Sequence, residues 1–116
     1  MAYDADLAER VRGLLAPQPG MSERRMFGGL CFLLWGNMAC GLVDGKLMLR
    51  VGRERCGEAL AQPHVAPMDF TGRPLKGRVY VLAAGVSSDT ALRAWLDRAL
   101  QFSSSLPRKL PGEKRP

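Results

Sequence analysis

Two short turn signals divide the first half of the chain into segments of strand length. Gly36-Asn37 begins with glycine, which suits a type II′ turn, and Asp44-Gly45 is typical of a type I′ turn. The runs that flank both signals are rich in apolar residues. The stretch 24–51 is therefore predicted to fold as an antiparallel meander, around which the rest of the chain is organised.

The same two turns predict how the three strands of the meander pair. If Trp35 pairs with Met38 and Val43 pairs with Lys46, one face of the sheet is wholly apolar. That face then carries Cys31, Leu33, Trp35, Met38, Cys40, Leu42, Leu47, Leu49 and Val51. A slip of one residue in either pairing would mix charged side chains into this face. We therefore expect it to be the core face of the sheet.

The remaining elements follow from apolar periodicity and from capping residues. We expect a helix from Asp4 or Asp6 to Pro17, a strand over residues 22–27, a helix over 53–61, a strand over 78–82, and a last helix from Ser87 or Ser88 to residues 103–105. The stretch 64–77 is punctuated by proline and glycine, which predicts an ordered loop. This order predicts an α+β fold with two layers, in which an antiparallel meander sheet of about five strands carries three helices on one face.

The opposite face of the meander is more apolar than a solvent-exposed face requires. Phe32, Leu34 and Met48 border a floor of small residues, Ala39 and Gly41. Apolar patches often mark interfaces, so these residues form a candidate interaction face for a protein partner or for a second copy of the chain. The alternative is that the mid-chain loop folds over this face and buries it.

At 116 residues the chain is long enough for one domain, which we expect over residues 1–107. The formal net charge is +6, and about half of that excess comes from the tail 108–116, whose composition predicts disorder. A basic surface favours nucleic acid through counterion release, whereas the alternative is a solvated rim. The candidate contacts to an anion or nucleic acid are Arg24, Arg25, Arg50 and Arg53, with Arg55 beside them and with Arg108 and Lys109 in the tail.

The chain offers few residues for catalysis or metal binding. His64 is the only histidine, and no motif places a serine or cysteine beside it. Cys31 and Cys40 share the predicted core face, which makes them packing residues, and neither belongs to a Cys-x-x-Cys pair. We therefore predict no catalytic, cofactor or metal site and no enzymatic activity.

The cysteine count and the hydropathy predict where the protein resides. Three cysteines cannot all pair within one chain, which fits a reducing compartment. The N-terminal segment is acidic and amphipathic, unlike the basic and then apolar signal peptide. No stretch approaches the roughly 20 apolar residues of a membrane span. These features predict a cytoplasmic protein with no membrane partner.

Two separated motifs resemble one protein family. The first runs through residues 25–30 (RMFGGL), 36–41 (GNMACG) and 47–52 (LMLRVG), and the second is residues 67–74 (PMDFTGRP). In this order they are similar to the TfoX/Sxy N-terminal domain, and the resemblance extends over about residues 1–107. The chain looks like a small standalone member, because the named members carry a second, C-terminal domain.

The resemblance implies antiparallel strands that carry helices, and it implies a link to regulation. The named members are bacterial competence regulators that act with the cyclic-AMP receptor protein at certain promoters. The family supplies no catalytic residues to place on this chain. Our first hypothesis is a small cytoplasmic regulatory or protein-interaction module. The alternative is a nucleic-acid-associated transcriptional regulator that uses its basic surface and tail.

Overall fold

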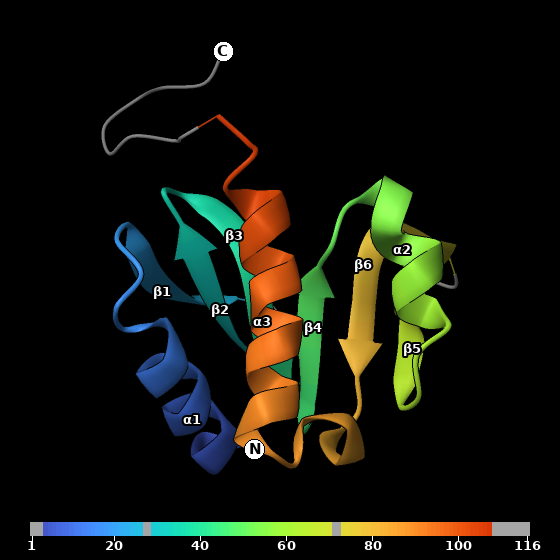
Figure 1. Ribbon diagram of the computed structural model, residues 1–116, viewed down its shortest axis with the longest axis horizontal. Helices are drawn as coiled ribbons and strands as arrows, with labels where there is room; N and C mark the ends of the chain where they lie inside the picture. Colours follow the sequence, from blue (N-terminus) through green and yellow to red (C-terminus); the bar gives the residue numbers. More distant parts are fainter. Residues whose placement is uncertain (1–3, 27–28, 71–72, 108–116) are drawn as a thin grey trace.

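The structure, a computed structural model, describes residues 4–26, 29–70 and 73–107. Within these residues six antiparallel strands form one sheet in the order β1-β2-β3-β4-β6-β5. The strands are β1 (Met21–Met26), β2 (Gly29–Leu34), β3 (Asn37–Val43), β4 (Lys46–Arg50), β5 (Val65–Phe70) and β6 (Arg73–Val81). The helices of the same residues are α1 (Ala5–Leu15), α2 (Arg53–Leu60), α3 (Asp89–Ser103) and a short 3-10 helix, η1 (Ala83–Val86). Helices α1 and α3 lie in front of the sheet (Figure 1), which confirms the α+β prediction.

Both long helices begin at capping residues that the sequence indicates. The Asp4 carboxylate accepts hydrogen bonds from the backbone N–H groups of Asp6 and Leu7, at 2.9 and 3.2 Å. The Ser88 hydroxyl accepts one from the backbone N–H of Ala91 at 3.1 Å. These bonds satisfy N–H groups that have no partner within the helix, so they decide where α1 and α3 start.

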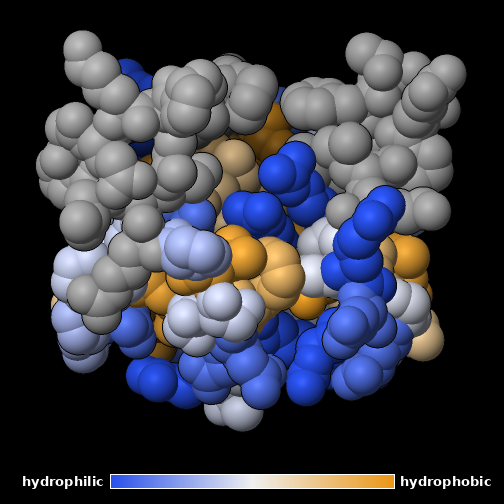
Figure 2. Space-filling model, turned by 90° about the horizontal axis from the view of Figure 1, so that it is seen from above, coloured by the Kyte–Doolittle hydropathy of each residue, from blue (hydrophilic) through white to orange (hydrophobic). Residues whose placement is uncertain are grey.

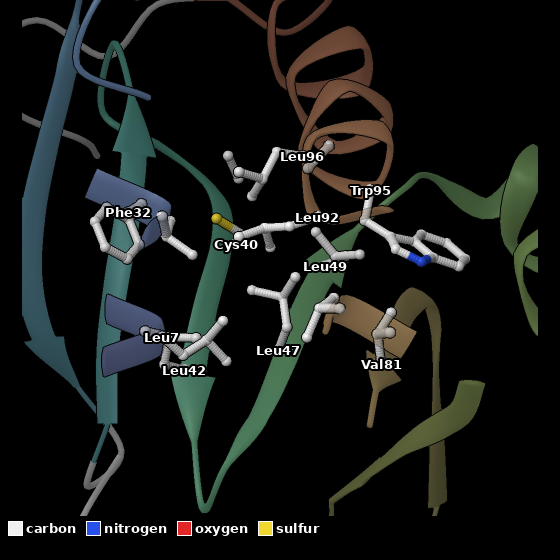
Figure 3. Packing of buried hydrophobic residues seen from close by; sticks show 14 of the residues in the cluster. Leu7, Phe32, Cys40, Leu42, Leu47, Leu49, Val81, Leu92, Trp95 and Leu96 are labelled. Atoms are coloured by element: carbon white, nitrogen blue, oxygen red, sulfur yellow. The ribbon is translucent and has the colours of Figure 1, made fainter. Parts of the chain in front are cut away.

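The core lies between the helices and one face of the sheet. Leu47 and Leu49 of β4 are fully buried and belong to one cluster with Leu92 and Leu96 of α3 (Figure 3). Burial of each such side chain contributes about 1.5–3 kcal/mol of hydrophobic stabilisation. Because side chains alternate along a strand, the positions of these leucines decide which face of β4 the helices cover.

The β3–β4 hairpin has the predicted register. Val43 pairs with Lys46 across the turn formed by Asp44 and Gly45. Both turn residues have positive φ angles, 50° and 74°, as a type I′ turn requires. The local dipeptide is therefore sufficient to set this register.

The predicted register of β2 against β3 is wrong. Leu34 pairs with Asn37, so the turn consists of Trp35 and Gly36, whose φ angles are 49° and 83°. The Asn37 side-chain amide donates a hydrogen bond from Nδ2 to the carbonyl of Pro107 at 2.8 Å, which holds Asn37 at the start of β3. A contact across the fold, in addition to the local dipeptide, therefore positions this turn.

The observed register includes a shift between Phe32 and Leu33 and reverses the faces of β2. Phe32 pairs with Cys40, and both belong to the core cluster beneath the helices (Figure 3). Cys31 pairs with Gly41 and lies on the other face. The prediction that Cys31 shares the core face with Cys40 is therefore wrong, because a one-residue change of register inverts every side chain of a strand.

The stretch predicted as an ordered loop forms a hairpin instead. β5 pairs with β6, and β6 also pairs with β4 through residues 78–81. Pro67 lies in β5 at the edge of the sheet, and Pro74 lies in β6 beyond the residues that pair with β4. Proline at these places removes no hydrogen bond to a third strand. The sheet of the described residues consequently has six strands, where about five were expected.

Two other predictions concern the tail and the membrane. Arg108 and Lys109 belong to the predicted tail 108–116, which lies outside the described residues. Within the ranges that the structure describes, none of the helices combines the length and the apolar character needed to cross a membrane.

Candidate functional site: the second face of the sheet

The face of the sheet opposite the core carries a row of residues that crosses five strands. Arg24 pairs with Cys31, Cys31 with Gly41, Gly41 with Met48, and Met48 with Tyr80. Paired residues on neighbouring strands point to the same side of a sheet. We call this surface the second face. Its members include Arg24, Cys31, Gly41, Val43, Lys46, Met48, Arg50, Arg78 and Tyr80, and Ala66 of β5 pairs with Tyr80.

The apolar centre of the second face is closed. Cys31 is 4% exposed and Met48 is 5% exposed. A Cβ atom on Gly41 would lie 3.3 Å from the Cys31 Sγ atom and 3.4 Å from the Met48 Cε atom, so the glycine lets these two side chains converge above it. The centre of the second face therefore offers a partner little apolar surface.

The residues of the predicted interaction face do not share one surface. Gly41 and Met48 lie on the second face, whereas Phe32 and Ala39 belong to the core cluster. Leu34 is also buried, at 2% exposure. The cause is the register of β2, which turns Phe32 toward the helices.

Arg50 of β4 and Arg78 of β6 are directly opposed on the second face. The guanidinium carbon of Arg50 lies 5.3 Å from the centre of the Phe102 ring, within the range of a cation–π contact. Burial lowers the pKa of Arg50, and the charge of Arg78 lowers it further. Two like charges thus stand side by side, a situation that a neighbouring anion would relieve.

The Phe102 ring is positioned by Gly52. A Cβ atom on Gly52 would lie 2.6 Å from the ring, and the φ angle of this glycine is 87°, in the left-handed region. A pocket of about 380 Å³, lined by Arg55 and Gln101 among others, borders the same ring. Figure 2 shows the molecule from above, the end toward which β4 runs in Figure 1; hydrophobic residues are visible in the middle and at the right edge, with hydrophilic residues below and between them.

The members of the second face whose side chains the structure describes carry positive charge and no carboxylate. The cations are Arg24, Lys46, Arg50 and Arg78, and the Lys46 ammonium lies 4.9 Å from the centre of the Tyr80 ring. The ion pairs of the described residues are Arg10–Asp89, Arg12–Glu9, Arg12–Glu23 and Arg98–Glu58. None of these pairs includes Arg50 or Arg78; the side chains of residues 68–76 are outside those that the structure describes.

The structure separates the other predicted contact residues. Arg25 pairs with Leu30, a core residue, and so points to the helix side of the sheet. Arg53 and Arg55 are exposed on or beside the first turn of α2. Of the predicted contacts that the structure describes, the second face therefore unites Arg24 and Arg50.

Sequence reasoning missed Arg78 as a member of this site. A usable signal was present, because Arg78 and Tyr80 alternate with Val79 and Val81, which are core residues. The alternation shows that Arg78 points away from the core. It does not show that β6 lies beside β4, which is what places Arg78 opposite Arg50.

The thiols of Cys31 and Cys40 are packing groups. Burial raises the pKa of Cys40 to about 12. Burial also raises the pKa of Cys31, while the charge of Arg78 acts in the opposite direction. Both thiols are therefore protonated and poorly nucleophilic at neutral pH. These two cysteines and Cys56 are all free.

His64 has a backbone role. Its side chain is exposed, its φ angle is 63°, and its carbonyl accepts a hydrogen bond from the N–H of Leu82 at 2.8 Å. This bond joins the start of β5 to the end of β6. Among the described residues, no group of three or more histidine, cysteine, aspartate or glutamate side chains lies close enough to hold a metal ion.

A groove of about 550 Å³ lies on the other side of the sheet, between the end of α1 and strands β1 and β2. Leu15, Met21 and Phe32 contribute apolar lining. Arg12 and Glu23 also line it, and they form an ion pair with each other. Because that guanidinium is already paired, the groove is a weaker candidate for an anion than the second face.

A comparison with protein-family models matches residues 13–103 to the TfoX N-terminal domain. The chain belongs to the TfoX N-terminal domain family. The match runs from within α1 to the end of α3 and confirms the resemblance, over a narrower span than residues 1–107. All four cations of the second face lie inside the matched TfoX N-terminal domain. A search of curated proteins found no match, and neither did a search of solved structures.

Proposed function

We propose that this TfoX N-terminal domain is a small cytoplasmic regulatory module that binds an acidic segment of a protein partner through its second face. The observation that carries the proposal is the charge of that face: among the side chains that the structure describes, its members include four cations and no carboxylate, and Arg50 stands opposite Arg78. Complementary charge steers association and selects among partners. The regulatory part of the proposal rests on the resemblance to the competence regulators.

Binding is better supported than catalysis. Nucleophilic catalysis needs an activated, accessible nucleophile, and the Cys31 and Cys40 thiols are buried with raised pKa values. The His64 side chain is exposed, and the hydrogen bond between this residue and Leu82 is accepted by its backbone carbonyl. The three free cysteines support the cytoplasmic setting, because small secreted proteins usually hold their cysteines in disulfides.

The aromatic rings of this region favour a protein partner over single-stranded nucleic acid. Single-strand binding relies on aromatic faces on which bases stack. Here both rings are already in contact with other residues: Lys46 lies over the Tyr80 ring, and the Phe102 ring contacts Arg50 and Gly52. These rings therefore offer less free surface on which a base could stack. A nucleic-acid-associated regulator is the second candidate. The same cations and the net charge of +6 favour it, because phosphate contacts need no stacking.

A second copy of the chain is the less supported occupant. In a two-fold dimer through the second face this surface would meet itself, so its cations would approach the same cations of the other copy. Like charges brought together at an interface cost on the order of several kcal/mol. We expect a monomer in light scattering of the pure protein at tens of micromolar. A dimer under these conditions would favour the second copy instead.

A charge-reversal experiment tests the proposed function. The double variant Arg24→Glu, Lys46→Glu reverses two charges of the second face outside the Arg50–Arg78 pair. The control, Arg93→Glu, reverses an exposed charge on α3, on the helix side of the sheet. Each protein is immobilised and exposed to a cytoplasmic extract and, separately, to an oligoglutamate peptide and to a DNA duplex.

We expect the double variant to lose the acidic proteins that the wild type captures and to bind oligoglutamate about tenfold more weakly or worse. Arg93→Glu should behave as the wild type. Equal capture by the double variant and the wild type contradicts the proposal. A duplex that binds the wild type more tightly than oligoglutamate, with an affinity that falls steeply with salt, supports the nucleic-acid candidate.

A further inference from the structure

Arg50 and Arg78 face each other on neighbouring strands, an arrangement that destabilises a strand pair because like charges repel. Arg10, Arg12 and Arg98 each have an acidic partner. Among the side chains that the structure describes, which do not include those of residues 68–76, no carboxylate forms an ion pair with Arg50 or Arg78. The pair is therefore a concentrated positive charge with no counter-ion among these side chains.

The Arg50 head group makes an aromatic contact that limits its motion. Its guanidinium lies over the Phe102 ring, and that ring packs where Gly52 has no side chain. This contact reduces the conformational entropy that Arg50 would lose on binding. The charge of Arg78 contributes to the lowered pKa of Arg50, and a bound anion would remove that contribution.

We propose that Arg50 and Arg78 form a two-arginine clamp for one oxyanion, the side-chain carboxylate of an aspartate or glutamate in an acidic segment of the protein partner. The inference rests on the proposed function and names its contact point. A guanidinium presents its N–H groups in a planar fork that matches the two oxygens of a carboxylate. Phosphate shares this chemistry, so it serves as a probe of the clamp.

The probes are inorganic phosphate and a short oligoglutamate peptide, titrated calorimetrically onto the full chain. The variants are Arg78→Gln, Arg78→Lys and, as a control on α3, Arg93→Gln. We expect Arg78→Gln to bind both probes about tenfold more weakly or worse, because it loses one charged donor fork. Arg78→Lys should fall between this variant and the wild type, since lysine keeps the charge without the fork. Arg93→Gln should bind as the wild type does.

The melting temperature separates a binding arginine from a structural one. At low salt without added anion, Arg78→Gln should raise the melting temperature because it removes the repulsion with Arg50. Phosphate should raise the melting temperature of the wild type beyond chloride of equal ionic strength, and should lose that advantage in Arg78→Gln. A lower melting temperature for Arg78→Gln with an unchanged phosphate response overturns the clamp. Equal probe affinities of Arg78→Gln and Arg93→Gln also overturn it.

The outcomes distinguish a failure of the clamp from a failure of the proposed function. If Arg78→Gln loses oligoglutamate binding but no acidic protein is captured from the extract, the clamp is supported and the proposed function is contradicted. If wild type and Arg78→Gln capture an acidic protein equally, the clamp is contradicted and the proposed function is supported. Tighter binding of a DNA duplex than of oligoglutamate at the same salt, abolished in Arg78→Gln, overturns the assignment to a carboxylate in favour of phosphate.

Discussion

The Arg12 guanidinium of α1 donates two hydrogen bonds to the Glu23 carboxylate of β1, with Nε 2.7 Å from Oε2 and Nη2 3.0 Å from Oε1. It also pairs with Glu9, one turn away in α1. The pKa of Arg12 is raised, chiefly through the hydrogen bond to Glu23. Glu23 pairs with the core residue Phe32 and so points to the helix side. Strand β1 thus sends this carboxylate to α1 and its neighbour Arg24 to the second face.

We expect Glu23→Gln to lower the melting temperature, though by less than the truncation of a core residue. The substitution removes one charge of a two-bond pair, but both side chains are partly exposed, so water screens the loss. Thermal unfolding followed by circular dichroism measures the effect. The control is Glu58→Gln, whose single contact to Arg98 spans 3.7 Å and should matter less. A larger loss for Glu58→Gln would contradict the importance of the Arg12–Glu23 pair.

Phe32→Ala should lower the free energy of unfolding by about 3–5 kcal/mol, because it empties space in the core. If the Phe32 side chain were instead exposed to solvent, the change would be within about 0.5 kcal/mol. Urea denaturation distinguishes the two values. Leu60→Ala is the matched control, since Leu60 is among the exposed large hydrophobic residues of the described chain and should cost far less. A near-neutral Phe32→Ala would contradict the placement of Phe32 in the core.

Gly52→Ala and Gly57→Ala should have opposite effects on stability. At Gly52 the φ angle is positive and a Cβ atom would meet the Phe102 ring, so alanine should cost about 1–3 kcal/mol. At Gly57, within α2, a Cβ atom meets nothing within 4 Å, so alanine should stabilise the helix by about 0.5–1 kcal/mol. Denaturant titration of both variants gives the two signs. A tolerated Gly52→Ala would show that the ring can move away, and Arg50 would then not be held in place.

The free energy of unfolding should fall as the pH rises from about 9 toward about 12, in part because of Cys40. Burial raises the pKa of this thiol from 9.0 in the ordinary case to about 12 in the folded chain. Between these values the native state keeps a proton that the unfolded state has lost, so rising pH favours unfolding. Below pH 9 both states are protonated and the contribution is constant. Urea titrations over this range should show a shallower decline for Cys40→Ala; an identical slope would place the alkaline loss in other groups.

Signals between sequence neighbours determined several parts of this fold. The Asp44-Gly45 dipeptide accepts the positive φ angles of its turn, so the β3–β4 register follows from it alone. Asp4 and Ser88 set the starts of α1 and α3 through hydrogen bonds that span two or three residues. The motifs that identify the TfoX N-terminal domain are equally local. Each of these features is complete within a short segment.

The misassigned elements depend on partners far away in the chain. Asn37 stands at the start of β3, and its side chain donates a hydrogen bond to the carbonyl of Pro107, the last described residue. Pro67 is compatible with a strand because β5 is at the edge of the sheet, which no local pattern reveals. Neither prediction could succeed without knowledge of which distant segment lies beside the element.

In the candidate site, local sequence signals determined one part of the arrangement and distant neighbours determined the other. Alternation in the sequence by itself determined that β4 sends Arg50 away from the core, and it carried the same information for Arg78 in β6. Only the tertiary structure decided that β4 and β6 are neighbours, although α2 and β5 separate them in the chain. Strand pairing brings opposed Cα atoms to within about 5.5 Å whatever their distance in sequence, and it thereby turned two separate cations into one site.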